Sequence, residues 1–390
     1  MEIQEIVDNM FLASPDSPPP LLTNTEGIYL YDAKGRKTMD CSGGPMTVSI
    51  GYGRKEVAEA AAKSIRQVSY ALPTYATEPR ISLVKRIKKL LPDSLDQVYF
   101  CSGGSEANEA AIKLARQYQV LAGRSSKYKV ISRNLSYHGM TMFTLSIGDI
   151  KPRREYFSPI LWDNPRIQPC YCYRCPFGRK YPGCDMDCAF DLEKTILKEG
   201  PDTVATFIAE PVVAAAAGAL VPPAEYFPII REICDKYEVL FLADEVVTGF
   251  GRTGANMGMD NFGAVPDISI FGKGVSSGYA PLAGMAVSRE IVDVFRETKA
   301  PFQHLYTFSG HPLVCAVGDE VQRIIEEENL IPLAKKTGRY LGEKLQELKS
   351  HPIIGDVRGL GMLWTIEFVK DKKTREPFPQ EMNVTLSVLG

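Results

Sequence analysis

Short apolar runs alternate with helical segments through the middle of the chain. The runs have the length of buried strands and lie at 97–101, 129–132, 203–209, 239–243, 268–271 and 282–287. Helices are predicted at 57–67, 79–91, 105–122 and 222–237. Strands that alternate with helices are typical of a mostly parallel sheet with helices on both faces. The pattern therefore predicts an α/β fold, with one large domain over residues 49–300.

The two ends of the chain are organised differently. The predicted elements are a short helix and a proline-rich linker (1–23), a hairpin (strands 27–31 and 38–40) and two long helices (312–328 and 331–350). We expect residues 1–48 and 301–390 to form a smaller α+β domain together.

Two predicted strands end on residues with candidate chemistry. Asp244 follows the strand at 239–243, and Lys273 stands between two glycines after the strand at 268–271. In open parallel sheets, ligands bind outside the carboxyl ends of the strands. Lysine forms Schiff bases with carbonyl cofactors, and pyridoxal phosphate (PLP) needs such a lysine together with an acid beside its pyridine nitrogen.

A third strand end resembles a phosphate site. The strand at 97–101 leads into Gly103, Gly104 and Ser105, which open a helix. Free N–H groups and the positive end of the helix dipole attract phosphate there, and Ser105 suits both an N-cap and a phosphate donor. An ordinary helix cap without a ligand is the alternative when this motif is taken alone.

These motifs together resemble a known family. The segments Asp244–Val246, Gly249–Gly254 and Gly272–Gly274 are similar to the signature of class III (omega-type) aminotransferases, which are fold type I PLP enzymes. The resemblance implies that Lys273 forms the Schiff base and moves the proton, while Asp244 keeps the pyridine nitrogen protonated. It further implies cofactor contacts from Gly103, Gly104, Ser105, Tyr137 (ring stacking), Glu210, Val246 and, on the phosphate of a neighbouring subunit, Thr307. His138, next to Tyr137, is not expected to be catalytic.

The resemblance also implies a fold and an activity. The large domain would hold a mostly parallel sheet of the seven-stranded type. The expected reaction transfers an amino group from an omega-amino acid or amine to a 2-oxo acid, pyruvate or 2-oxoglutarate, by a ping-pong mechanism in a homodimer with shared active sites. Racemases, aminomutases and phospholyases use the same fold and remain alternatives. A non-catalytic metal-binding protein is a remote alternative.

Composition narrows the range of partners. The formal net charge of -2 gives no strong attraction to nucleic acid or to an anionic membrane. No apolar run reaches the ~20 residues that cross a bilayer. The first five residues lack the basic and apolar form of a signal peptide, so a cytoplasmic location is expected.

Five of the nine cysteines cluster in a proposed insertion at about 165–190. They are Cys170, Cys172, Cys175, Cys184 and Cys188. Thiols this close could bind zinc or an iron–sulfur cluster, form disulfides or stay free, and their spacing matches no metal motif that we can justify. We expect little regular structure and no direct role in the chemistry.

Three features depart from the family pattern. Residues 212–218 are small and apolar where the family carries a glutamine and glycines. The loop at Gly43–Pro45, which lines the substrate pocket in the family, lacks bulky aromatic residues. Family members usually continue beyond the position of Gly390, often with a mobile arginine that pairs with the residue matching Glu210, so we expect either a truncated sequence or a shortened small domain.

Overall fold

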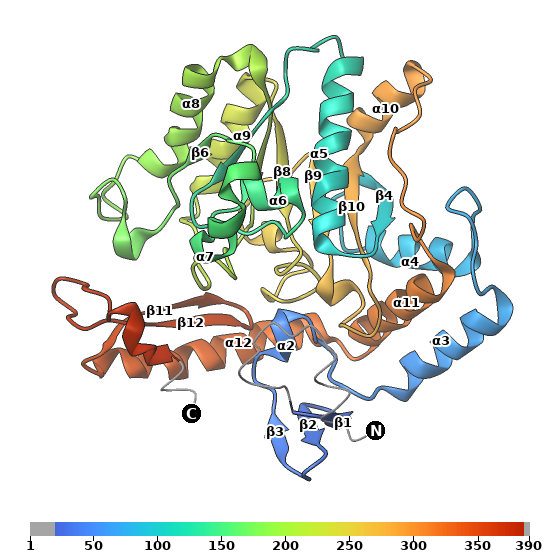
Figure 1. The fold of residues 1–390 in the computed structure, drawn as a ribbon, viewed down its shortest axis with the longest axis horizontal. Helices are drawn as coiled ribbons and strands as arrows, with labels where there is room; N and C mark the ends of the chain where they lie inside the picture. Colours follow the sequence, from blue (N-terminus) through green and yellow to red (C-terminus); the bar gives the residue numbers. More distant parts are fainter. Residues whose placement is uncertain (1–19, 386–390) are drawn as a thin grey trace.

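A central seven-stranded sheet organises the molecule. The computed structural model describes residues 20–385, so the predicted N-terminal helix lies outside the described residues. The strand order is β4 (Leu95–Cys101), β10 (Ala283–Ser288), β9 (Ile268–Phe271), β8 (Leu240–Asp244), β7 (Val204–Ala209), β5 (Lys129–Arg133) and β6 (Arg166–Ile167). Only β10 runs antiparallel to its neighbours in this sheet, and the predicted mostly parallel sheet is confirmed (Figure 1).

Alternate residues of each strand face opposite layers of helices. Ile208 and Leu242 pack with α5 (Gly104–Leu121) on one face, whereas Phe207 and Phe241 pack with α9 (Tyr226–Lys236) on the other. All four side chains are fully buried. Because both faces are covered, these strands are apolar on both sides, which is why they read as continuous apolar runs in the sequence.

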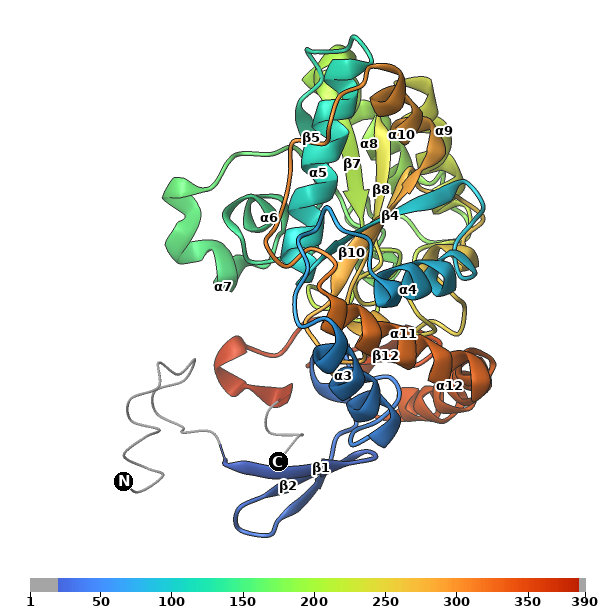
Figure 2. The same cartoon turned by 90° about the vertical axis from the view of Figure 1, so that its right-hand side faces the viewer.

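The remaining helices extend these layers. They are α3 (Lys55–Gln67), α4 (Glu78–Lys88), α6 (Met142–Ile147), α7 (Lys151–Arg154), α8 (Asp187–Glu199) and α10 (Arg289–Glu297). Helix α8 packs with α9 in one core, and α10 packs beside α5 in another. Helices α6 and α7 project from the same side of the sheet as α5 (Figure 2).

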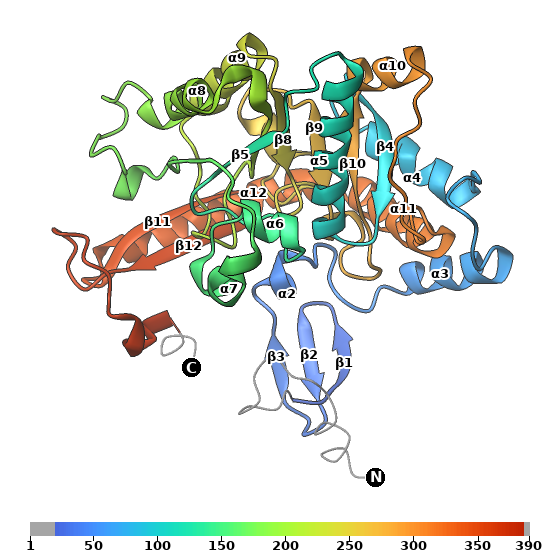
Figure 3. The same ribbon diagram turned by 45° about the horizontal axis from the view of Figure 1, so that its top comes forward.

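Segments from both ends of the chain lie below the sheet. They comprise the three-stranded sheet β1 (Leu22–Glu26), β2 (Tyr29–Asp32) and β3 (Lys37–Met39), the irregular turn α2 (Gly43–Met46), helices α11 (Pro312–Glu327) and α12 (Leu330–Glu347), and the hairpin β11 (Ile354–Leu360) and β12 (Leu363–Phe368). Figures 1 and 3 show α12 running along this hairpin. A Cβ at Gly338 of α12 would lie 2.1 Å from the Gly361 carbonyl oxygen, so this packing requires glycine.

The sequence predicted most of these elements. Strands β1, β6, β11 and β12 and helices α6, α7, α8 and α10 were not predicted. The loop expected at Gly43–Pro45 contains a four-residue turn, in which Gly44 and Pro45 depart from helical geometry. Between 152 and 190 the regular elements are short until α8 begins, as expected.

Helices long and apolar enough to cross a membrane are absent from residues 20–385.

Candidate active site

A cavity of about 450 Å³ opens at the carboxyl ends of the parallel strands. Eight of the nine residues predicted to act or bind there line it, namely Gly103, Gly104, Ser105, Tyr137, Glu210, Asp244, Val246 and Lys273. They come from five segments of the chain, which follow β4, β5, β7, β8 and β9. The parallel arrangement brings these strand ends to one edge of the sheet, as predicted.

One wall of the cavity is the N-terminus of α5. The N–H groups of Gly104 and Ser105 have no hydrogen-bond acceptor among residues 20–385. The Ser105 hydroxyl accepts a hydrogen bond from the Met140 N–H at 3.1 Å, which leaves its own proton for a ligand. Ser105 lies in the first turn and Gly103 is the N-cap, so the predicted capping role of Ser105 is wrong. Unpaired donors at the positive helix end suit a phosphate group.

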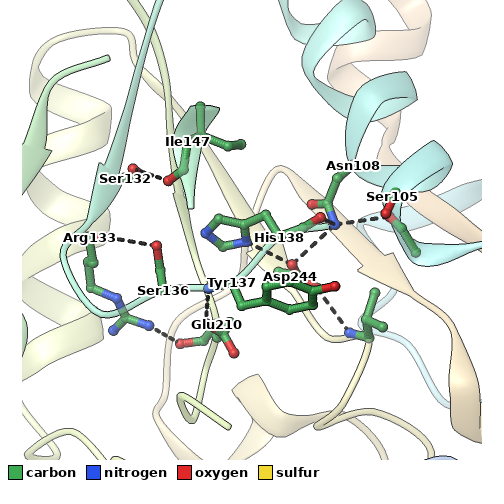
Figure 4. Close-up of polar contacts among 12 residues, drawn as sticks. Ser105, Asn108, Ser132, Arg133, Ser136, Tyr137, His138, Ile147, Glu210 and Asp244 are labelled. Atoms are coloured by element: carbon green, nitrogen blue, oxygen red, sulfur yellow. Dashed lines mark hydrogen bonds and ion pairs between the residues drawn. The ribbon is translucent and has the colours of Figure 1, made fainter. Parts of the chain in front are cut away.

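The Asp244 carboxylate is held in a buried network (Figure 4). Its Oδ2 accepts hydrogen bonds from His138 Nδ1 at 2.8 Å and from Asn108 Nδ2 at 3.2 Å, and its Oδ1 accepts from the Val246 N–H at 3.2 Å. The His138 side chain is fully buried and Asp244 is 4% exposed. Three donors fix the direction of this carboxylate, so it can present a fixed negative charge to a ligand in the cavity.

His138 and Asn108 also belong to the candidate site, and the sequence did not single them out. His138, which we did not expect to be catalytic, contacts the predicted cofactor acid Asp244. Asn108 donates to Asp244 from the buried face of α5, where Ala107, Ala110 and Ala111 surround it. A lone amide in a stripe of alanines was the signal available in the sequence, because buried polar groups need partners.

Glu210 supports the opposite wall of the cavity. Its carboxylate accepts hydrogen bonds from the N–H groups of Tyr137 at 3.0 Å and Ala214 at 3.2 Å. Burial raises the pKa of Glu210, against the lowering effect of His138. The Arg133 guanidinium donates to the Glu210 backbone oxygen (Figure 4), whereas no arginine among the described residues pairs with its carboxylate. Glu210 therefore fixes the Tyr137 backbone in this structure.

Lys273 reaches the cavity from a strained turn after β9. Its backbone φ of 43° lies in the left-handed region, which lysine rarely adopts. Burial lowers the pKa of Lys273, while Asp244 and Glu210 raise it. Its Nζ makes no hydrogen bond or ion pair within residues 20–385. A lysine with a lowered pKa and an unengaged amine is suited to nucleophilic attack on a carbonyl.

Glu245, the neighbour of Asp244, points away from the cavity and holds the glycine-rich turn. It accepts hydrogen bonds from the N–H groups of Gly258 at 2.7 Å and Met259 at 2.8 Å, and from the Thr248 hydroxyl. Burial raises the pKa of Glu245 to about 7. The second acid of this motif is therefore structural.

Thr307 is placed elsewhere on this protomer. It is exposed, and its backbone oxygen accepts a hydrogen bond from the Tyr70 hydroxyl at 3.2 Å. Leu305 and Phe308, next to it in the chain, are also exposed, as are Leu72 and Tyr75 in the segment that follows Tyr70. Thr307 does not line the cavity of its own protomer.

A second cavity, of about 660 Å³, lies beside the first. The Gly43–Pro45 loop lines it together with Ala214, Arg252 and Trp364. Residues 212–218 lie between the two cavities and have small side chains. One of them, Ala215, forms part of the wall of the first cavity. The Gly43–Pro45 loop, which was predicted to line the substrate pocket, therefore lies next to the first cavity. Thr47, which follows this loop, lines the first cavity itself.

The cysteine cluster lies away from this site. All nine cysteines are free thiols, and no group of three or more His, Cys, Asp or Glu residues in the part of the chain that the structure describes could hold a metal ion. All five clustered cysteines line one small space, and the sulfur of Cys170 lies 3.6 Å from Arg133 Nη1. The cluster packs against the back of the Glu210 segment through Arg133.

The residues around the first cavity fit PLP. The unpaired N–H groups of α5 match a phosphate, the fixed Asp244 carboxylate matches a pyridine nitrogen, and the free Lys273 amine matches an aldehyde. Tyr137 lines the same cavity and supplies an aromatic face for the cofactor ring. Two of the glycines leave little room for a side chain. A Cβ at Gly139 would lie 2.4 Å from Ser105 Oγ and would displace it, and a Cβ at Gly104 would lie in tight contact with Val246 Cγ1 at 3.1 Å.

Known proteins resemble this chain over nearly all its length. The family model for class III aminotransferases matches residues 12–386. The putrescine–pyruvate aminotransferase of Pseudomonas aeruginosa is 39% identical over 361 residues, which cover 92% of this chain and 79% of that protein.

Solved structures agree with this result. A thermostable (S)-enantioselective omega-transaminase from Thermomicrobium roseum superposes with a TM-score of 0.92 at 37% identity, over 98% of this chain and 88% of that one. The omega-transaminase of Pseudomonas jessenii, solved in complex with PMP (pyridoxamine phosphate), superposes with a TM-score of 0.90 at 31% identity, over 97% and 86%. The matched length and the PLP-compatible cavity lead to one conclusion: this chain belongs to the class III aminotransferases, a PLP-dependent family of enzymes.

Proposed function

We propose that Lys273 and Asp244 are the catalytic residues of this aminotransferase, and that its reaction moves an amino group from a diamine or omega-amino acid to pyruvate. The observation that supports these roles most strongly is their position in one cavity with the unpaired N–H groups of α5. Within that cavity, each of the three groups matches a different part of PLP.

PLP, when bound, supplies the aldehyde that takes up the amino group and the ring that accepts electrons from the substrate carbon. Lys273 would hold the cofactor as a nucleophile, and its free amine would serve as the base that removes a proton from the substrate carbon. Its lowered pKa favours the neutral amine needed for both steps. Asp244 holds a proton on the ring nitrogen, because a nearby negative charge favours the protonated form.

The proposed phosphate ligands are Gly103, Gly104 and Ser105, with Tyr137 against the ring. Val246 and Glu210 complete the pocket, Val246 by closing the space beside Gly104 and Glu210 by fixing the Tyr137 backbone. The same cavity must accept donor and acceptor in turn, which gives ping-pong kinetics. Pyruvate is favoured as the acceptor because the P. aeruginosa relative is named for it; 2-oxoglutarate is the alternative.

The proposal includes a homodimer in which Thr307 reaches the phosphate of the partner's cofactor. The supporting observation is that apolar side chains near Thr307 in the chain, Leu305 and Phe308, are exposed. Proteins that act as monomers rarely expose large apolar patches, and such patches usually mark a binding surface. We also propose a cytoplasmic location, for which the nine free thiols are the supporting observation.

A spectroscopic titration tests the proposed roles. The purified protein is loaded with PLP, and its visible absorbance is recorded for the wild type, Lys273→Ala and the control Lys151→Ala, an exposed lysine of α7. The band of the lysine-bound cofactor should be lost only in Lys273→Ala. Putrescine added without a 2-oxo acid should convert the wild-type cofactor to its pyridoxamine form, and pyruvate should restore it. A band that no amine changes would contradict the proposed donors, and a band retained in Lys273→Ala would contradict the role of the lysine.

A further inference from the structure

The turn that carries Lys273 is strained and has few backbone hydrogen bonds of its own. Lys273 has a backbone φ of 43°, a conformation that costs free energy and persists only where neighbouring groups impose it. After Lys273 the chain makes one short helical turn, which ends at Val275. The carbonyl oxygens of Gly274 and Val275 accept no hydrogen bond from a backbone N–H of residues 20–385. Because Val275 is fully buried, its carbonyl needs a donor from a side chain.

Gln322 of α11 supplies that donor. Its Nε2 donates to the Gly274 oxygen at 3.1 Å and to the Val275 oxygen at 3.0 Å. Only the nitrogen end of an amide can face two carbonyl groups, so the orientation of this side chain is fixed. Gln322 is 3% exposed, and its own amide oxygen has no hydrogen-bond partner in the described part of the chain. An unpaired buried oxygen costs stability relative to an apolar side chain, so what Gln322 contributes is its pair of bonds to the turn.

The helix that carries Gln322 is a firm support for this turn. Cys315 of α11 packs in one core with Val275 of the turn and with Leu83 and Ile87 of α4. All four of these side chains are fully buried. Since this core fixes α11, the two hydrogen bonds from Gln322 tie the turn to an element that does not move with it.

Other side-chain contacts hold only the chain that follows the turn. Ser276 Oγ donates to the Ala280 oxygen at 2.7 Å, and Ser277 Oγ accepts from the Ser49 N–H at 2.7 Å. The Lys273 amine has no hydrogen bond or ion pair within residues 20–385, so the backbone of its turn decides where it points.

We propose that Gln322 is a positioning residue for Lys273: its two hydrogen bonds keep the strained turn in place and keep the lysine amine directed at the cofactor aldehyde. The inference rests on the proposed function, in which Lys273 is the residue that binds PLP. Without the amide, the turn relaxes toward ordinary backbone geometry and the amine loses its fixed direction. A reacting group displaced by about 1 Å can lose about 100-fold in rate.

The test separates capture of PLP by Lys273 from binding of the cofactor by the rest of the cavity. Capture joins the lysine nitrogen to the aldehyde carbon and releases water, and its rate is the growth of the visible band after full-length apoprotein is mixed rapidly with PLP. Binding without capture is measured by calorimetry with deoxypyridoxine phosphate, a PLP analogue in which a methyl group replaces the aldehyde. The main variant is Gln322→Met, which keeps the length of the side chain and removes the donor.

Gln119 offers a matched control, because it is a second buried glutamine that bridges two backbone carbonyls. Its Nε2 donates to the oxygens of Ala205 at 3.2 Å and Glu238 at 3.0 Å, at the edge of the sheet opposite the cavity. Gln119→Met therefore removes the same kind of bridge away from Lys273. A third variant, Gln322→Glu, keeps the size of the side chain and, while its carboxyl is protonated, one O–H donor.

Gln322→Met should slow capture by about 10-fold or more and leave the affinity for the analogue within about two-fold of the wild type. Gln119→Met should leave both quantities within about two-fold, even where urea unfolding shows it to be destabilised. Gln322→Glu should fall between the wild type and Gln322→Met, and its capture rate relative to the wild type should fall as the pH rises, because an ionised carboxylate repels the two carbonyl groups. This pH dependence carries the test if Gln322→Met does not fold.

Three results would overturn the proposal. Equal losses of capture and of analogue binding would mean that Gln322 only stabilises the fold of the cavity. Unchanged capture in Gln322→Met, or equal slowing in Gln119→Met, would show that the two bonds do not direct the lysine. A wild type that forms no visible band with PLP, or a Lys273→Ala variant that keeps the band, would instead refute the proposed function, and this inference with it.

Discussion

The contact between His138 and Asp244 gives the sharpest test of how this site is built. The two side chains are buried and joined by a 2.8 Å hydrogen bond, with Asn108 as the second side-chain donor at 3.2 Å. His138→Leu removes the imidazole donor. Oδ2 of Asp244 then keeps only the longer hydrogen bond from Asn108, in a buried site that water does not reach. His138→Asn is the matched variant, because its amide nitrogen occupies the position of Nδ1.

The expected loss follows from this geometry. A hydrogen bond to a charged group contributes about 1.5–3 kcal/mol, so His138→Leu should lower the free energy of unfolding of the apoprotein by that amount. Asp244 should also turn from its proposed direction, and the affinity for PLP should fall by up to about 100-fold, since each 1.36 kcal/mol is a factor of ten. His138→Asn should recover most of both losses.

Two measurements check this reasoning. Urea unfolding of the apoprotein gives the free energy of unfolding, and titration of the apoprotein with PLP, followed by absorbance, gives the affinity. Equal losses in the leucine and asparagine variants would mean that imidazole packing, rather than the donor, stabilises the site. Wild-type affinity in His138→Leu would show that Asn108 and the Val246 N–H suffice to orient Asp244.

Three further predictions concern other parts of the structure. Gly139→Ala should weaken PLP binding in an absorbance titration, because its Cβ would lie 2.4 Å from Ser105 Oγ and displace that hydroxyl; unchanged affinity would exclude Ser105 as a ligand. Gly338→Ala should lower the free energy of unfolding by about 1–3 kcal/mol in urea and leave PLP affinity unchanged, since its Cβ would lie 2.1 Å from the Gly361 oxygen, far from the cofactor cavity. Burial raises the pKa of Glu245 from 4.5 to about 7, so the folded protein binds a proton on this carboxyl more tightly than the unfolded chain does. The free energy of unfolding that Glu245 contributes is therefore fully present below pH 4.5 and is lost as the pH rises through 7. Urea unfolding at pH 5 and pH 8 should therefore show Glu245→Gln gaining about 2.5 kcal/mol relative to the wild type between the two values, and a difference that does not change with pH would contradict the raised pKa.

Part of the active site was predictable because its signals are local. Three motifs can each be recognised from a few neighbouring residues: Lys273 between two glycines, Asp244 at the end of a buried strand, and the Gly103–Ser105 turn. The parallel sheet then brings the three segments to one cavity, as the pattern of strands and helices indicated.

The missed residues act over long distances in the chain. His138 and Asp244 are separated by 106 positions, and Asn108 and Asp244 by 136. A histidine after a strand or an amide in a helix has no fixed partner until the sheet order sets which strand ends are neighbours. The cysteine cluster was equally undecided, because spacing alone does not fix the directions of the thiol groups.

The sequence by itself determined most of the helices and strands of this protein and the local motifs from which its candidate site is built. Apolar runs, helical spacing and the glycines around Lys273 depend on interactions within short segments, which any copy of those segments would share. The tertiary structure alone decided how the charges are arranged: Asp244 is held by His138 and Asn108, Glu245 turns away to hold a loop, and Arg153 stacks on Tyr137. These contacts depend on which strand ends the sheet places side by side, and on which side chains burial forces to find partners, so they exist only once the whole chain has folded.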